Sequence, residues 1–106
     1  MSGALKPSDF HVLLTLSAGP RHGYGIMKDV ERESDGEVRL EIGSLYRLLG
    51  RLLDVGLIEE TGGDDGRRRY YQLSRSGRHA LKAEAERIAG LVDLVRARKI
   101  LPESRS

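Results

Sequence analysis

The stretch that decides the fold is residues 43–73, which reads GSLYRLL at 43–49, GLIE at 56–59, GGDDG at 62–66 and RRRYYQL at 67–73. Apolar residues at helical spacing come first, and two short strand-like runs follow on either side of a glycine-rich loop. A helix followed directly by a cationic β-hairpin is the arrangement of a winged helix-turn-helix. We therefore predict a mainly α fold with a small β-wing.

The helix in this stretch has a clear apolar side. One buried stripe is predicted from helical spacing, formed by Ile42, Leu45, Leu49, Leu52 and Leu53. Gly56 follows the last of these residues, where a left-handed C-terminal cap is expected.

The predicted wing consists of two strands, at about 57–61 and 67–73, joined by an exposed tip at 62–66. Tyr71 and Leu73 are two residues apart, so they share the face of the second strand that we expect to meet the core.

Upstream of this stretch the sequence predicts two further helices. The first begins near Pro7 and ends at Ala18-Gly19-Pro20, and its apolar side is formed by Phe10, Leu13, Leu14 and Leu16. The second runs from about His22 to Glu33, and its core-facing residues are expected to be Tyr24, Ile26, Met27 and Val30. The alternating run 38–40 is a further candidate strand.

A last helix is predicted from about Ser76 to Lys99, with Ser74 as its cap. At 1.5 Å per residue it would be roughly 35 Å long and would extend beyond so small a core. Its apolar stripe needs a cover, and the simplest cover is the same helix of a second copy in a two-fold dimer. The predicted interface residues are Leu81, Ala85, Ile88, Leu91, Val92 and Val95. The alternative, a helix folded back on its own domain, stays open.

Composition indicates one soluble globular domain with an uneven charge distribution. The chain has 106 residues, 32% charged and 39% hydrophobic, and no cysteine, which excludes disulfides and thiolate metal sites. No apolar run reaches the roughly 18 residues of a membrane span and no secretion signal is evident, so a cytosolic protein is expected. Residues 1–66 carry a net charge of −5 and residues 67–106 carry +7. Such segregation favours a polyanionic partner.

The expected DNA contacts lie on the helix at 43–49 and on the wing. A helix in the major groove presents its first turns, and arginine is the best bidentate partner for guanine. Tyr46 borders the buried stripe, so its position fits either packing or a base contact. Phosphate or minor-groove contacts are expected from the three wing arginines. The predicted contact set is Ser44, Tyr46, Arg47, Arg51, Arg67, Arg68 and Arg69.

Catalysis has little support in the sequence. His11, His22 and His79 are far apart in sequence, and Ser44 has no partner at the spacing of a catalytic motif. The acidic pair Asp64-Asp65 lies on the predicted tip, a poor place to preorganise a metal or an acid–base pair. We therefore expect no enzyme activity, no cofactor and no metal.

The motifs resemble those of the PadR family of bacterial transcriptional regulators. The resemblance extends from about Phe10 to Leu81, and the matching segments are HGYGI at 22–26, GSLYRLL at 43–49, GLI at 56–58 and RYYQLS at 69–74 with Gly77. The first two segments, in this order, are its most specific part. Where the family often has proline before the motif glycine, this chain has Ile42. That residue leaves the start of the helix less fixed.

The resemblance implies a homodimeric DNA-binding protein, usually a repressor, in the subgroup with a single C-terminal helix. In it, residues 1–74 would form the DNA-binding domain, 75–101 the dimerisation helix and 102–106 a flexible tail. Many members of the family are released from DNA by a small molecule. A tryptophan that stacks on planar ligands in some members is absent here. A possible effector pocket between dimer helices is predicted from Phe10, Leu14, Ile88 and Val92.

A rival interpretation treats the chain as an interaction module that does not bind DNA. In that case the acidic half, residues 1–66, would be offered to a basic partner. Retention on random duplex DNA at low salt discriminates between a DNA-binding regulator and such an interaction module.

Overall fold

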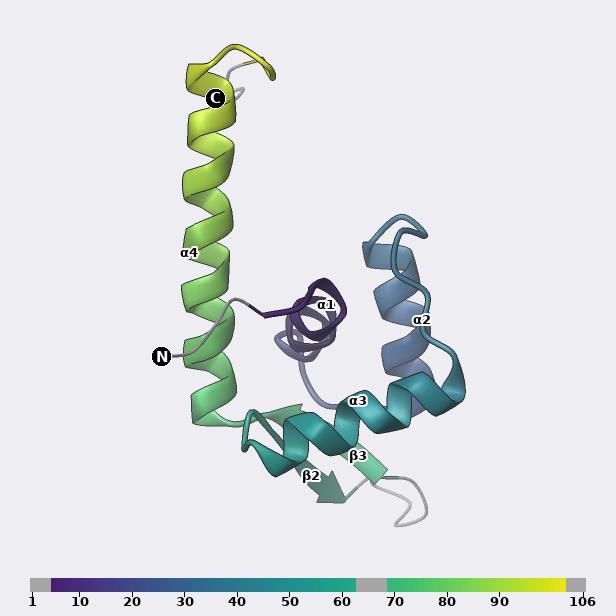
Figure 1. Cartoon of the computed structure of the whole chain (residues 1–106). Helices are drawn as coiled ribbons and strands as arrows, with labels where there is room; N and C mark the ends of the chain where they lie inside the picture. The colour runs from purple at the N-terminus through teal and green to yellow at the C-terminus, as the bar shows by residue number, and fades with distance from the viewer. Residues whose placement is uncertain (1–4, 63–68, 103–106) are drawn as a thin grey trace.

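Helices and short strands make up most of the computed structural model, which describes residues 5–62 and 69–102. In order, the elements are α1 (Pro7–Leu16), β1 (Arg21–His22), α2 (Gly23–Glu33), α3 (Ile42–Asp54), β2 (Ile58–Gly62), β3 (Arg69–Leu73) and α4 (Arg75–Ala97). The three strands form one antiparallel sheet in the order β1-β3-β2. Helices α1 to α3 gather beside the sheet, and α4 stands along one side of the molecule, opposite α2 (Figure 1). The predicted mainly α fold with a small β-wing is confirmed.

A single apolar core joins the first three helices to the hairpin. Its members come from α1, α2, α3, β2 and β3: Val12, Leu13, Leu16, Ile26, Val30, Leu45, Leu48, Leu49, Leu52, Ile58, Tyr71 and Leu73. Tyr71 and Leu73 face the core as predicted.

Three residues expected in or near the core are largely exposed instead. Ile42 is the first residue of α3 and remains 58% exposed, because the core ends one turn later, at Leu45. Tyr24 is 56% exposed and its ring packs under the ammonium of Lys28, 5.4 Å from the ring centre. Leu14 is 39% exposed on the side of α1 away from the core.

The candidate strand at 38–40 is wrong, since this segment lies in irregular extended chain. The backbone N–H of Val38 donates to Ser34 Oγ at 2.9 Å, so a side chain satisfies it instead of a neighbouring strand. Val38 and Leu40 still pack on the core, which accounts for their alternating pattern. The third strand is Arg21–His22, whose residues pair with Tyr71 and Tyr70.

The junction between the hairpin and α4 is tightly packed. Gly56 ends α3 with a φ of +79°, and Ser74 Oγ accepts from the N–H of Gly77 at 3.0 Å, so both predicted caps are confirmed. A Cβ atom at Gly77 would lie 1.9 Å from the carbonyl oxygen of Leu57. Glycine is therefore required where α4 leaves the sheet, and this contact fixes the direction of the helix.

The first half of α4 is attached to the rest of the chain by a buried carboxylate. Glu84 is 6% exposed and accepts from Arg87 Nε at 3.0 Å and from Arg87 Nη2. Hydrogen bonding from Arg87 lowers the pKa of Glu84, burial opposes this shift, and the charge of Arg87 and the N–H of Leu5 add to the lowering. This side chain therefore joins α4 to the segment that enters α1.

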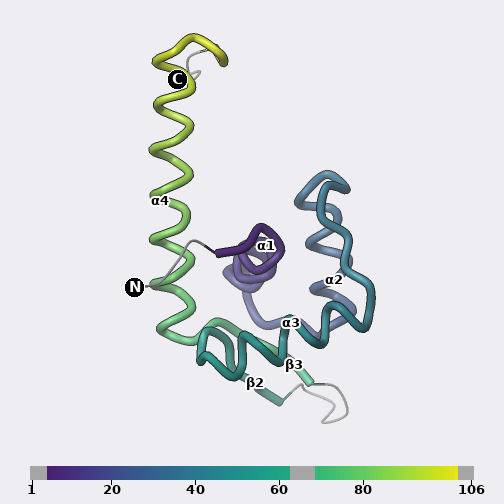
Figure 2. Tube along the Cα trace, in the orientation of Figure 1, coloured from purple at the N-terminus to yellow at the C-terminus, as the bar shows by residue number. Residues whose placement is uncertain are grey.

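The second half of α4 extends past the other elements (Figure 2). The molecule accordingly measures 51 × 31 × 26 Å along its principal axes. None of the helices in the ranges 5–62 and 69–102 combines the length and apolarity needed to cross a bilayer.

Candidate nucleic-acid interface

The predicted contact residues of α3 occupy three different sides of the helix. At about 100° per residue, Ser44 and Tyr46 project roughly 160° apart, with Arg47 between them. Arg47 is exposed, and its Nη2 lies 3.4 Å from Ser44 Oγ. The outermost side of the first two turns is therefore presented by Arg47, with Ser44 on one flank and Tyr46 on the other.

The N-terminal end of α3 has an open backbone. Its N-cap residue, Glu41, makes no side-chain cap bond, and the first turn contains no acidic residue. The N–H groups of such an end carry partial positive charge, which favours an anionic group nearby. This end of the helix, which also carries Arg47, is the part of α3 best suited to meet a polyanion.

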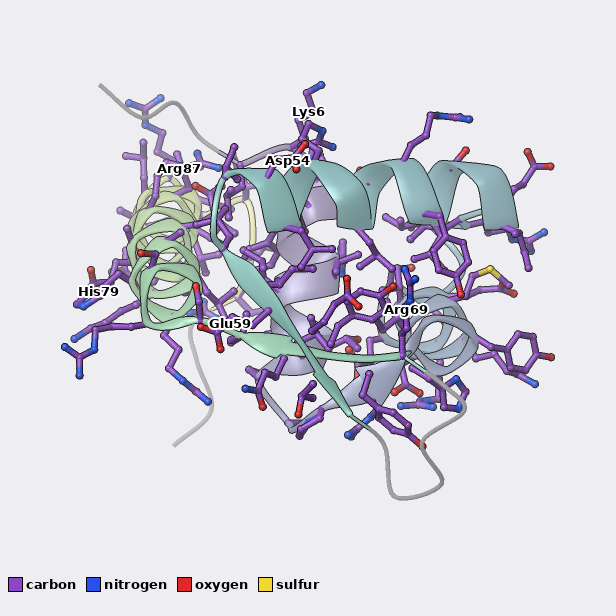
Figure 3. All side chains as sticks on the ribbon, turned by 90° about the horizontal axis from the view of Figure 1, so that it is seen from below. Lys6, Asp54, Glu59, Arg69, His79 and Arg87 are labelled. Carbon is purple, nitrogen blue, oxygen red and sulfur yellow. The ribbon has the colours of Figure 1, made fainter. Side chains whose placement is uncertain are left out.

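The described part of the wing holds one of the three predicted arginines. Arg69 lies at the end of β3 farther from α4, on the side that faces α3 (Figure 3). Its Nε is 3.7 Å from Glu60 Oε1, and its side chain remains 77% exposed, so the pair is weak. Arg67 and Arg68 lie outside the described residues. In the described hairpin the positive charge of Arg69 thus stands beside the carboxylate of Glu60.

A buried tyrosine lies behind Arg69. Burial raises the pKa of Tyr71 above its ordinary value, and the nearby charges of Glu60 and Tyr46 add to this rise. The charge and hydrogen bonding of Arg69 oppose it. Arg69, Tyr71 and Tyr46 are therefore close enough to interact electrostatically, which links the wing to α3.

Arg51 is engaged with another helix. Its Nη1 and Nη2 donate to Asp9 Oδ2 and Oδ1 at 2.8 and 2.9 Å, and the Asp9 side chain is 6% exposed. The hydrogen bond to Asp9 raises the pKa of Arg51. The guanidinium is thus bound and its charge balanced within the protein, so we leave Arg51 out of the contact surface proposed below. Helical spacing placed it off the buried stripe but could not reveal this partner on α1.

The residues of the predicted dimer interface share one side of α4 but differ in their surroundings. Leu81 packs on the core of its own chain. Ile88, Val92 and Val95 are partly buried, whereas Ala85 is exposed and Leu91 is 49% exposed. Leu81 is therefore also left out of the interface proposed below.

Two of the four residues expected around an effector come from α1 and two from α4. Phe10 is half-buried and packs edge-on against His11, with ring centres 5.8 Å apart, and Leu14 is more exposed. Helix α1 contacts α4, so these residues and Ile88 belong to neighbouring elements. Two pockets of the described residues lie at the C-terminal ends of α2 and α4.

Comparisons with known proteins agree with this geometry. The profile of the transcriptional regulator PadR-like family matches residues 12–83. An uncharacterised 37.1 kDa protein of a Streptomyces fradiae transposon is 40% identical over 80 residues, which are 76% of this chain. The chain spans only 22% of that protein's length.

Solved structures show the same fold. A transcriptional regulator from Clostridium thermocellum is 26% identical, with a TM-score of 0.71 over 85% of this chain and 87% of its own. Bacillus subtilis PadR, solved in complex with operator DNA, is 23% identical, with a TM-score of 0.65 over 74% of this chain and 46% of its own. From the profile match over most of its length, the chain belongs to the PadR-like family of transcriptional regulators.

Proposed function

We propose that the chain is a homodimeric repressor that binds a near-palindromic DNA operator. The observation that carries this proposal is the exposed position of Arg47, with the half-buried Ser44 beside it, on the first turns of α3, whose N-cap makes no side-chain bond, near the wing that bears Arg69. A helix end with open N–H groups and an exposed guanidinium suits the edge and backbone of a major groove. A DNA partner would also place the protein in the cytoplasm.

In this proposal Arg47 contacts bases, and the wing arginines, Arg67 to Arg69, bind phosphates. Arginine can donate two hydrogen bonds to guanine, whereas phosphate contacts carry no sequence information. Ser44 lies within reach of Arg47 and is suited to a phosphate or a base edge. Bacillus subtilis PadR, which shares the fold, was solved with operator DNA, and this supports the choice of partner.

The dimer would form through the second half of α4. Leu91, Val92 and Val95 continue the apolar side of the helix past the core of the chain, and Leu91 is 49% exposed. Covering such a stripe with its symmetry mate removes apolar area from water on both copies. Residues 75–101 would then be the dimerisation segment and 1–74 the DNA-binding domain. The predicted tail falls mostly on 103–106, outside the described residues.

A small apolar effector would bind between α1 and α4 of the dimer. Phe10 and Leu14 are partly exposed on α1, which contacts α4, the helix that carries Ile88 and Val92. A second α4 packed there would close a space lined by these four residues. Occupation of that space would alter the angle between the two copies and weaken DNA binding.

The test is selection of fragments from fragmented genomic DNA by the purified protein. Strong enrichment of a few promoter fragments that share an inverted repeat is the expected result. Recovery of random fragments, or of none at low salt, would contradict DNA recognition and favour the interaction module.

A further inference from the structure

One aromatic side chain connects the first turns of α3 to the start of α2. A Cβ atom built on Gly23 would lie 2.5 Å from Tyr46 Oη and 3.0 Å from its Cζ. Real Cβ atoms essentially never lie within 3.0 Å of such an atom, so a side chain at position 23 would displace the phenol end of Tyr46 from the α2 backbone. Gly23 is buried, and Tyr46 is 48% exposed. The ring therefore lies over the start of α2 with one side in solvent.

The sheet brings the wing to the same place. β1 leads directly into α2, because His22 is both the last residue of the strand and the N-cap of the helix. His22 pairs with Tyr70 of β3, and their rings meet edge-on with centres 5.6 Å apart. Tyr71, the next residue of β3, is buried, and Tyr46 is among the groups that influence its pKa. The end of α2 that Tyr46 contacts at Gly23 is thus joined through His22 and Tyr70 to the wing strand.

Leu45 attaches the first turn of α3 to the core, but the start of that turn has little other support. Glu41 provides no side-chain cap, and Ile42 and Gly43 are exposed. Arg47 follows Tyr46 directly, so the direction of its side chain changes with any rotation of this turn about the helix axis. A fixed Tyr46 ring therefore adds to Leu45 a second attachment, on the side of α2, that restricts the orientation of Arg47 relative to the wing.

We propose that Tyr46 is a positioning residue for DNA recognition, which acts through its contact with Gly23 and sets the orientation of Arg47 relative to the wing. The proposal rests on the DNA-binding function proposed above. It separates Tyr46 from the residues that touch DNA. Its physical basis is that specificity requires base-reading groups held to within a fraction of an ångström, whereas phosphate contacts tolerate looser placement.

The test is a double-mutant cycle between Gly23→Ala and Tyr46→Leu. The two probes are the duplex that wild-type protein selects from a random library and a scrambled duplex of the same composition. In wild-type background, Gly23→Ala displaces the ring, and we expect the ratio of the two affinities to fall about tenfold. In the Tyr46→Leu background the added methyl group meets a shorter side chain and should change the ratio little. Equal losses in both backgrounds would overturn the proposal.

Tyr46→Phe distinguishes positioning from a direct contact. The ring and its Cζ remain, so this variant should keep the affinity ratio within about twofold of wild type. If the Tyr46 hydroxyl bonded to a phosphate instead, Tyr46→Phe should lose a similar amount of affinity for both duplexes. That result would also contradict the proposal. Thermal unfolding of each variant, measured at one protein concentration, separates these effects from general loss of stability.

Hydrogen exchange of the α3 amides in the free protein provides a readout without DNA. Gly23→Ala should speed exchange at residues 45–47 in the wild-type background and leave it unchanged in the Tyr46→Leu background. A wild-type protein that selects no duplex would refute DNA recognition, and with it the role of Tyr46 in specificity. Selection of a duplex together with no coupling in either measurement would refute the positioning role alone.

Discussion

The head of the molecule, formed by the described residues 5–62 and 69–73, and the distal half of α4, residues 90–97, use apolar side chains in opposite ways. In the head these residues close on one another, and Leu45, Leu49 and Leu52 are at most 1% exposed. In distal α4 they continue along one side of a helix that extends past the other described elements (Figure 2). The head can thus be explained from one chain, whereas we expect distal α4 to be covered by a second copy.

The largest expected effect comes from a substitution at Gly77, where α4 leaves the head. Gly77→Ala places a methyl group on the carbonyl oxygen of Leu57, which is backbone and cannot rotate away. We expect a loss of about 3 kcal/mol of stability, measured by thermal or denaturant unfolding.

Gly90→Ala is the matched control, because nothing lies within 4 Å of the Cβ atom built there. Alanine in the middle of a helix should instead raise stability by about 0.5–1 kcal/mol. Similar effects at the two glycines would mean that the packing at Leu57 does not fix α4 to the head.

The second prediction concerns the exposed stripe itself. Val95→Glu puts a charge on the apolar side of distal α4, and burying it in a dimer would be unfavourable in both copies. The dissociation constant of the dimer, measured by analytical ultracentrifugation, should rise at least about 100-fold. Ala89→Glu adds the same charge to an exposed position off the stripe and should leave association unchanged. Loss of association in both variants, or in neither, would contradict the proposed interface.

The third prediction concerns the arginines of the head that we propose to contact DNA. Arg47→Ala should weaken binding to the selected duplex by about 1–3 kcal/mol and relax base preference at its contact position. Replacing Arg67 and Arg68 should weaken binding to every duplex. It should also flatten the salt dependence of binding, because a protein with fewer phosphate contacts releases fewer counterions when it binds. Arg98→Ala, at the C-cap of α4, is the control and should do neither. Identical behaviour of the Arg47 and wing variants would contradict the proposal that Arg47 reads bases while the wing arginines bind phosphates.

The smallest expected effect is a change in how stability depends on pH. Hydrogen bonding from Arg87 lowers the folded-state pKa of Glu84 below 4.5, so its contribution is fully present above that value. The contribution is lost as the pH falls through the folded-state pKa. Wild type should therefore be more stable than Glu84→Gln at pH 7, and the gap should close in acid. A gap that persists at low pH, or that also appears for the exposed Glu86→Gln, would contradict this role.

Most of the fold follows from local patterns in the sequence. The α3 stripe apart from Ile42, the cap glycine at 56, the Ser74 cap and the core face of β3 all depend on neighbours within a few residues, and each was predictable. The third strand was not, because Arg21 and His22 are paired only through their distant partners in β3.

The site was less predictable than the fold for the same reason. Arg47 could be placed on the exposed side of α3 from spacing alone. The partners of Arg51 and Tyr46 could not, since Asp9 and Gly23 lie in other helices and no periodicity connects them. Long-range polar pairs and close approaches depend on how the helices cross, which local pattern does not specify.

The central claim is that two heads, joined by their α4 helices, bind in successive major grooves of one duplex. It is tested most directly by changing the separation of the two half-sites in the selected duplex. With a rigid pair of heads, affinity should be greatest near one helical turn, about 10 base pairs between centres, and should collapse when about five base pairs are inserted. Affinity that is unchanged by the insertion would show that the heads bind independently, and would contradict the account.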